Sequence, residues 1–408
     1  MPEIAEVARV AHFLRKHLVG KRIARIVALD DTSVFGKVGT SGPAFEAALT
    51  GKRVVSAGSQ GKYFWLELDK PPHAVMHLGM SGWVHIRDVQ TMYKGGEKSK
   101  NTDKDADKDT WPPKYWKFHL ETDGDPGVSV AFTDTRRFGR IRLVDCPGAE
   151  IRSNSPLVEN GPDPVVDREI FTEEYLSKKM KGRHVPIKAF LLDQAMISGI
   201  GNWVGDEVLY QAKLHPEQYS DDFSNAEITR LYKAICFVCD TAVEVLGDSE
   251  KFPEDWLFNY RWGKGKADAP KTLPNGEKLM FLQVGGRTSC VVPSMQKKTG
   301  RVSEGIKQEE LGTRPDAKQK KGNNKNRRKD GDGNQEEAEE EAELEVRPAK
   351  KARSTTQKAV KKEDDEIVSI NEDSEPKKSK KKTTKKQSLP PRSSEGTRRS
   401  SRLSKTES

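Results

Sequence analysis

The 408-residue sequence has few of the residues that build disulfide-rich or membrane-spanning proteins. Four cysteines are too few for a disulfide framework. No apolar run approaches the roughly 18 residues that a transmembrane helix requires, and no N-terminal signal sequence stands at the start. We therefore expect a soluble intracellular protein that has no membrane partner.

The cysteines are also poorly placed for binding a metal. Cys236 and Cys239 form a C-x-x-C pair, but they lie within a helical apolar pattern, where small core residues are expected. Neither Cys146 nor Cys290 supplies a second pair at the spacing of zinc ligands. The sequence therefore predicts no metal site and no cofactor.

Aromatic residues are absent from the last quarter of the chain. All 14 Phe, 7 Trp and 8 Tyr lie before residue 282, so segment 301–408 cannot bury a core and is predicted to be disordered. Its 29 basic and 22 acidic residues carry seven of the nine net positive charges. Basic clusters at 350–353 and 377–386 favour a nuclear protein recognised by an import receptor, or a DNA-contacting tail. A purely solubilising extension is the alternative.

The other 300 residues suggest an α+β protein of several domains. After a first helix, short strands separated by Gly, Pro and Asp turns indicate an antiparallel sandwich or barrel. The polar stretch 94–110 is expected to be an inserted loop. The predicted strands cover residues 21–29, 54–55, 62–68, 74–86, 115–121, 128–133 and 138–144.

Beyond residue 167 the apolar spacing becomes helical and then returns to β near the end. We predict a catalytic domain at 2–150, a helical domain at 151–265, a hairpin at 266–300 and a tail at 301–408. The predicted helices cover residues 168–180, 186–197, 203–213, 224–246 and 254–260. The hairpin strands are placed at 278–284 and 289–292.

The first three residues admit a catalytic interpretation. If Met1 is removed, Pro2 offers a secondary amine, and an α-amino group has a pKa of about 8. Such an amine can attack a sugar carbon and form an iminium ion, with Glu3 as the proton carrier. The alternative is structural, because Pro2 and Glu3 also make a good helix start, with Gly20 as the stop. On these residues alone the structural interpretation is favoured.

Three further positions admit two interpretations each. Lys62 follows a glycine at a strand entrance and is either solvated or placed over an active site. The Gly-x-Gly turn before Asn202 either aims backbone N–H groups at an anion or lets helices pack closely. Arg287, near the hairpin turn, is either simply exposed or presented to DNA.

Six motifs in order resemble the formamidopyrimidine-DNA glycosylase/endonuclease VIII family. The likeness spans roughly residues 2–300 and overturns the structural interpretation of Pro2. The motifs are residues 2–7 (PEIAEV), 61–63 (GKY), 77–82 (HLGMSG), 133–139 (TDTRRFG), 199–202 (GIGN) with Glu207, and 286–288 (GRT).

The resemblance implies a fold and an activity. The fold is an N-terminal helix and β-sandwich, then a helix–two-turn–helix domain and a finger hairpin. The activity is that of a monomeric, bifunctional DNA glycosylase and lyase for oxidised purines, acting on damaged double-stranded DNA. Carried over by position, Pro2 attacks C1′, Glu3 protonates the sugar ring oxygen, and Lys62 contacts a phosphate and assists at the active site. Strand cleavage follows by β,δ-elimination.

The resemblance also implies a DNA-binding set. Met80, Arg136 and Phe138 correspond to the residues that fill the gap left by an extruded base. This trio argues against an endonuclease VIII-like preference for oxidised pyrimidines. The residues expected to hold phosphates are Arg137, Lys188, Asn202 and Arg287.

Two departures from the family pattern are informative. Ala5 stands where the family's opening motif commonly has proline, and only Cys290 stands where many bacterial members have four cysteines. The hairpin therefore resembles the zincless finger of plant and fungal members, which favour ring-opened purines and further-oxidised guanines. A non-catalytic DNA-damage or chromatin-binding protein on the same scaffold is the competing interpretation. The presence of Pro2 and Glu3 argues against it.

Overall fold

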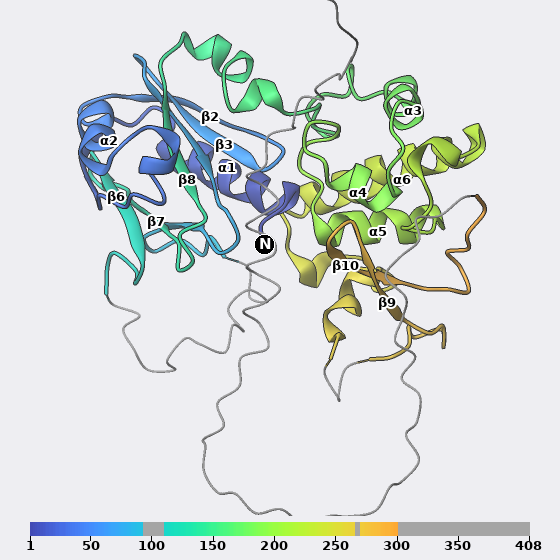
Figure 1. Cartoon of the computed structure of the whole chain (residues 1–408). Coiled ribbons are helices and arrows are strands. Elements are labelled where there is room, and N and C mark those ends of the chain that lie inside the picture. Colours follow the sequence, from blue (N-terminus) through green and yellow to red (C-terminus); the bar gives the residue numbers. More distant parts are fainter. Residues whose placement is uncertain (93–109, 266–269, 301–408) are drawn as a thin grey trace, which may run out of the picture. The chain divides into compact units, whose positions relative to one another are not determined.

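The computed structural model describes residues 1–92, 110–265 and 270–300 (Figure 1). Almost all of the predicted loop at 94–110 and the whole predicted tail at 301–408 lie outside these ranges, as do four residues of the predicted finger. The predicted domain boundaries therefore stay predictions. Within the described ranges, no helix is long and apolar enough to cross a membrane.

Helix α1 (Ile4–Leu18) begins two residues later than predicted. Glu3 is its N-cap in a capping box with Glu6, so Pro2 stands before the helix instead of in its first turn. The predicted stop is confirmed, because Gly20 has φ +86°, in the left-handed region that glycine tolerates.

Two four-stranded antiparallel sheets follow, and they confirm the predicted α+β class. Both sheets and the inner face of α1 contribute to one hydrophobic core. The first sheet has the order β1 (Ile23–Ala28), β6 (Trp116–Thr122), β7 (Ser129–Thr133), β5 (Trp83–Ile86). The second has the order β2 (Val54–Gln60), β3 (Tyr63–Leu68), β4 (His73–His77), β8 (Arg140–Val144).

The strand pattern was predicted well where residues alternate and poorly at one turn. In β3 every second residue is buried, as the alternation predicts. The single strand predicted at 74–86 is wrong, because a turn divides it into β4 and β5. Gly79 in this turn has φ +63°, and a Cβ there would lie 2.4 Å from the carbonyl carbon of Phe138. Helix α2 (Gly42–Leu49), which starts at the N-cap Ser41, was not predicted.

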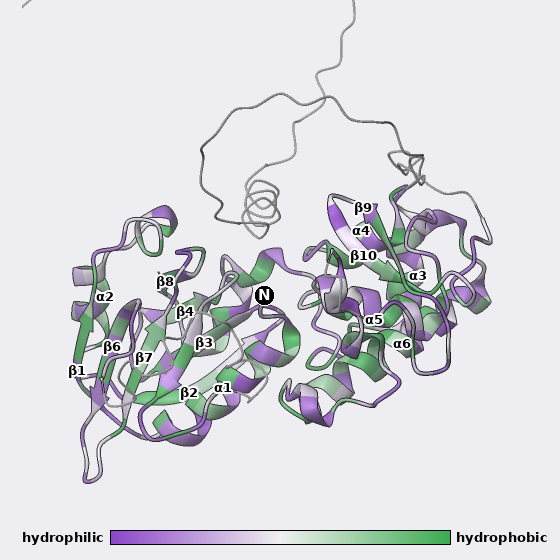
Figure 2. Ribbon diagram, turned by 90° about the horizontal axis from the view of Figure 1, so that it is seen from below, coloured by the Kyte–Doolittle hydropathy of each residue, from purple (hydrophilic) through white to green (hydrophobic). Residues whose placement is uncertain are grey.

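Four helices form a second core. They are α3 (Glu173–Lys181), α4 (Ile187–Leu192), α5 (Asn202–Ala212) and α6 (Asn225–Glu244). Helix α3 starts later than predicted because Thr172 caps it, and α4 ends at Leu192 instead of 197. Both hydrophobic and hydrophilic residues lie along α6 in Figure 2, as expected for a helix with one buried face, whereas α5 is buried along nearly its whole length.

Helix α1 takes part in both cores. Its first residues, Ile4 and Ala5, pack with α3–α6, whereas Val7 and Leu14 pack with the sheets. Short 3-10 helices complete the connections: η1 (Gly36–Val38), η3 (Gly148–Ser153), η4 (Leu157–Glu159), η5 (Ser220–Asp222), η6 (Ser249–Lys251), η7 (Leu257–Asn259) and η8 (Arg261–Gly263). The helix predicted at 254–260 is therefore the short η7.

The predicted hairpin is present as β9 (Met280–Val284) and β10 (Arg287–Val291). Its turn consists of Gly285 and Gly286, both at positive φ, and Arg287 pairs with Val284. Arg287 is therefore the first residue of a strand and not part of the turn.

Candidate active site and nucleic-acid interface

The Glu3 carboxylate lies at the N-terminus of helix α5. Glu3 is 1% exposed and accepts hydrogen bonds from the backbone N–H groups of Gly201 (2.8 Å), Trp203 (2.9 Å) and Val204 (3.1 Å). The first N–H groups of a helix lack partners within it, and their partial positive charge favours an anion. The start of α5 therefore fixes the carboxylate in one orientation.

This arrangement combines the two interpretations of the Gly-x-Gly turn. A Cβ at Gly201 would lie 2.2 Å from the Cδ of Glu3, so only glycine allows the carboxylate to approach this closely. Close packing and anion binding therefore occur together. The anion at the turn is the protein's own Glu3.

Pro2 is buried beside this site, whereas Met1 is 39% exposed. Two hydrogen bonds hold the chain just after it: the Glu3 N–H donates to Oε2 of Glu6 (2.9 Å), and the Ile4 N–H donates to the carbonyl of Gly199 (3.1 Å). The backbone around Pro2 and Glu3 is thus bonded to helix α1 and to the turn that precedes α5.

Glu6 is a site residue to which the sequence analysis gave no chemical role. It is buried, and burial together with the charge of Glu3 raises the pKa of its carboxyl to about 7. The available signal was the Glu-x-x-Glu spacing of a capping box at Glu3 and Glu6. That spacing indicates helix initiation, but not that the two carboxyl groups are buried together.

Lys62 is buried, which contradicts the solvated interpretation of this lysine. The preceding residue, Gly61, donates its N–H to Asp163 (2.7 Å), and a Cβ there would lie 2.6 Å from the Cβ of Ser198. Lys62 therefore leaves the backbone next to the turn that contacts Ile4. Its contact with a phosphate stays a prediction.

The structure brings Met80, Arg136 and Phe138 together. Asp134 joins their two loops, because it accepts hydrogen bonds from the Ser81 hydroxyl (2.6 Å) and the Gly139 N–H (2.7 Å). The guanidinium of Arg136 lies over the ring of Phe138, 5.3 Å from its centroid. Met80 is in the turn that packs against Phe138.

Arg137, in the same loop, is held by an aspartate. It has φ +59°, its side chain is 51% exposed, and Nε and Nη2 donate to Asp31 (2.9 Å). Burial by itself would raise the pKa of Asp31, but hydrogen bonds from Arg137 and Lys117 outweigh it and hold the pKa well below its usual value. The pair places an exposed guanidinium in a fixed position.

The prediction that Lys188 contacts a phosphate disagrees with the structure. Its side chain is fully buried, and Nζ donates to Asp206 (2.6 Å) and to the carbonyl of Asn202 (2.7 Å). Burial lowers the pKa of Lys188, an effect that Asp206 opposes. An ammonium group inside this network has no surface to offer a DNA backbone.

Asn202 contacts the hairpin next to Arg287. The Asn202 amide donates to the carbonyl of Thr288 (3.1 Å), next to Arg287 in β10. Arg287 is half-buried at the start of this strand. Their contacts with phosphates stay predictions.

Glu207 of the GIGN motif has a structural role. It is completely buried and accepts hydrogen bonds from the Gln211 amide and the Phe258 N–H, both at 2.8 Å. Burial raises the pKa of its carboxyl to about 7. Glu207 therefore ties the segment after α6 to α5.

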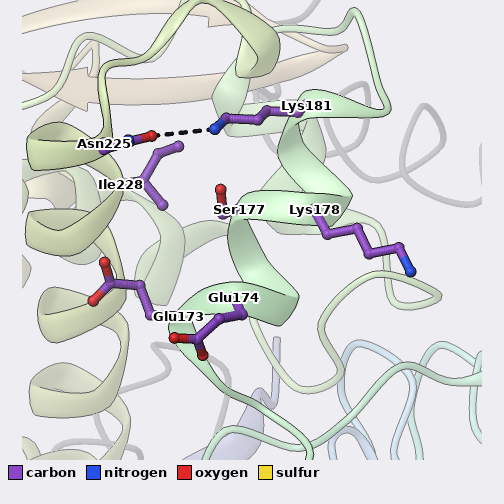
Figure 3. Close-up of a pocket in the computed structure, with 7 residues that line it drawn as sticks. All are labelled: Glu173, Glu174, Ser177, Lys178, Lys181, Asn225 and Ile228. Atoms are coloured by element: carbon purple, nitrogen blue, oxygen red, sulfur yellow. Dashed lines mark hydrogen bonds between the residues drawn. The ribbon is translucent and has the colours of Figure 1, made fainter.

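A surface pocket of about 400 Å³ lies between α3 and α6 (Figure 3). Figure 3 shows the Lys181 ammonium group donating a hydrogen bond to Asn225 at one end of the pocket. The acidic residues Glu173 and Glu174 lie at the other end, and Ser177 lies in the middle. The lining carries both signs of charge and includes none of the predicted site residues.

Comparison with known proteins assigns the chain to a family. Residues 1–141 match the formamidopyrimidine-DNA glycosylase N-terminal domain, and residues 160–254 match its H2TH domain. A formamidopyrimidine-DNA glycosylase of Arabidopsis thaliana is 39% identical over 306 residues, which cover 74% of this chain and 73% of the relative. The chain belongs to the formamidopyrimidine-DNA glycosylase family. Membership makes it a DNA-repair glycosylase.

Bacterial relatives extend the similarity. The enzyme of that name from Paracoccus denitrificans is 34% identical, over 73% of this chain and 100% of the relative. The fold is similar to that of the Lactococcus lactis formamidopyrimidine-DNA glycosylase, non-covalently bound to DNA containing an AP site (TM-score 0.58, 24% identity, covering 72% of this chain and 100% of that one). A MutM in complex with DNA containing carbocyclic 8-oxo-G gives a TM-score of 0.58 at 25% identity, over 73% of this chain and 100% of that one.

Proposed function

We propose that this protein is a bifunctional DNA glycosylase and lyase of base-excision repair, which removes oxidised purines through a Schiff base on Pro2. The observation that carries the proposal is the buried Glu3 carboxylate, held by three N–H groups of α5 beside Pro2. The DNA in the solved relatives' structures, which contains an AP site or an 8-oxo-G analogue, supports the substrate class.

In the proposed reaction, removal of Met1 exposes the Pro2 nitrogen, which attacks C1′ of the damaged nucleotide. Glu3 protonates the sugar ring oxygen and the ring opens; the base then leaves with the C1′–N electron pair and the proton given up by the Pro2 nitrogen, as the iminium ion forms. The iminium acidifies the C2′ protons, so loss of one of them expels the 3′ phosphate. A second elimination expels the 5′ phosphate, and water then hydrolyses the iminium, so the sugar remnant leaves Pro2 and a one-nucleotide gap remains.

The proposed DNA interface has two parts. Met80, Arg136 and Phe138 fill the gap left by the extruded base, an assignment supported by their proximity and by the contact of Arg136 with the Phe138 ring. Phosphate contacts, which fix the register of the DNA without reading its sequence, are assigned to Lys62, Arg137, Asn202 and Arg287.

We also propose that the enzyme acts as a monomer in the nucleus. The basic clusters at 350–353 and 377–386 support nuclear import, although they lie outside the described residues.

The test is borohydride reduction with duplexes that carry a formamidopyrimidine, 8-oxoguanine or an abasic site. We expect a covalent adduct that peptide mapping places on Pro2, and no adduct when Met1 removal is blocked. Glu3→Gln keeps the shape but not the proton transfer, so base excision should fall at least a hundredfold while DNA binding persists. The exposed Glu250→Gln is the matched control. An adduct on a lysine alone, or full excision by Glu3→Gln, would overturn the proposal.

A further inference from the structure

We propose that Asp206 is a positioning residue that fixes the hairpin β9–β10, and with it Arg287, on helices α4 and α5. The part of this inference that concerns DNA rests on the proposed function. The anchoring itself rests on the contacts of Asp206.

One buried carboxylate joins three segments of the chain. Asp206 is 1% exposed, and its Oδ1 accepts a hydrogen bond from Lys188 of α4 (2.6 Å). Its Oδ2 accepts from Arg261 of η8 (2.8 Å) and from the backbone N–H of Cys290 in β10 (3.1 Å). Charge-assisted hydrogen bonds are directional and strong when they are buried. They therefore set where β10 lies along α5.

A second contact shows that the anchoring is repeated along the strand. Asn202 lies four residues before Asp206, on the same face of α5, and its amide donates to the carbonyl of Thr288. Thr288 and Cys290 are two residues apart, so their backbone groups point to the same edge of β10. One helix face thus bonds one strand edge at two successive positions, directly after Arg287.

The hairpin turn is fixed on the neighbouring helix. Gly285 has φ +61°, and a Cβ there would lie 2.9 Å from the Cβ of Ala189 in α4. Both views of the molecule show β9 and β10 beside α4 and α5 (Figures 1 and 2). Cys290 also belongs to a hydrophobic cluster with Tyr210 and Leu257, which adds to the attachment, but apolar packing is non-directional and does not set the register.

The charge of Asp206 makes the test decisive. Asp206→Asn removes a negative charge, so electrostatics alone predicts tighter DNA binding. The anchor predicts the reverse: about tenfold weaker binding to a duplex with a tetrahydrofuran abasic-site analogue, and a salt slope reduced by about one, as for Arg287→Ala. Unchanged or tighter binding would overturn the proposal.

A double-mutant cycle connects the effect to Arg287. Arg287→Ala should weaken binding about tenfold in the wild type, but less than about twofold in the Asp206→Asn background. The matched control is Val238→Ala, a substitution of a buried residue in α6. In that background Arg287→Ala should still weaken DNA binding about tenfold. Additive losses in the Asp206→Asn background would contradict the anchor.

Hydrogen exchange in the DNA-free protein tests the anchor without the proposed function. In Asp206→Asn, the ratio of the exchange rates of hairpin amides at 280–291 to those of α6 amides should rise at least tenfold above its wild-type value, which separates local opening of the hairpin from global destabilisation. If Asp206→Asn fails to fold, Lys188→Met/Asp206→Asn keeps the net charge of the buried cluster and should show the same local acceleration. Unchanged hairpin exchange refutes the anchor, whereas a wild type that does not bind damaged DNA refutes the proposed function alone.

Discussion

The sheet region and the helical region each contain an aspartate that serves one of the proposed DNA-binding arginines, but in different ways. Asp31 bonds the guanidinium of Arg137 directly, with Lys117 as its second cation. Asp206 bonds Lys188 and Arg261, and reaches Arg287 only through the backbone of β10. A direct partner must share its arginine with a phosphate, whereas a backbone anchor orients the arginine without using its side chain.

The two aspartates also differ in how deeply their cations are buried. Both cations at Asp206 are nearly inaccessible, with side chains 0% and 7% exposed, whereas at Asp31 only the Lys117 side chain is buried (9% exposed) and the Arg137 side chain is 51% exposed. Removing one partner of a buried ion pair leaves an uncompensated charge, but an exposed partner is rehydrated. Two aspartates that each bind two cations therefore differ in their contribution to stability, and the one with the more deeply buried cations, Asp206, should contribute more.

The largest expected effect follows from this burial. Asp206→Asn should lower the free energy of unfolding by about 3–5 kcal/mol, because two buried cations lose their carboxylate. Asp31→Asn should cost less, since only one buried cation, Lys117, loses its carboxylate there, and water replaces the carboxylate at Arg137. Urea denaturation with a shared m-value would measure both losses. Equal losses would break the comparison between the two regions.

The sequence predicted the parts of the fold that follow from local periodicity. The alternation at 62–68 gave β3, and Gly20 marked the end of α1. The division of 74–86 into two strands was missed, because Gly79 turns the chain to meet Phe138, about 60 residues away in the sequence. Helix α2 was missed although Ser41 and Pro43 were present as start signals.

The site was predictable as a set of residues but not as a set of contacts. The family motifs identified Pro2, Glu3 and the Met80 trio, whereas the partners of Glu3 lie about 200 residues away and only the tertiary fold supplies them. Lys188 shows the limit most clearly. A lysine looks like a phosphate ligand in sequence until Asp206, 18 residues later, is found to enclose it.

A smaller effect concerns DNA binding and sharpens the comparison. Asp31→Asn should leave the slope of log affinity against log salt unchanged, because Arg137 still reaches its phosphate from the same backbone position. Arg137→Ala should lower that slope by about one. The two variants differ only in whether the guanidinium or its partner is removed. A slope lowered equally by both would show that Arg137 depends on Asp31 as strongly as Arg287 depends on its anchor.

The last expected effect is the dependence of stability on pH, which has opposite signs in the two regions. The pKa of Asp31 is lowered in the folded protein, so its stabilisation is present at neutral pH and is lost as the pH falls through the acid range. The pKa of Glu207 is raised from 4.5 to about 7, so the folded protein holds a proton that the unfolded chain releases. Its stabilisation is complete below pH 4.5 and is lost as the pH rises to 7.

Glu207→Gln isolates the second contribution, because the new amide does not titrate: its oxygen can accept from the Phe258 N–H and its NH2 can donate to the Gln211 oxygen once that amide flips. The difference in unfolding free energy between this variant and the wild type should shift in favour of the variant by on the order of 3 kcal/mol between pH 4.5 and pH 7.5. Denaturation at half-unit pH intervals would measure it, with the exposed Glu250→Gln as the control. Asp31→Asn should change the pH profile only on the acid side. If the unfolding free energies of Glu207→Gln and the wild type differed by the same amount at every pH, Glu207 would have an ordinary pKa in the folded protein. Its two hydrogen-bond donors would then offset the effect of burial on that pKa.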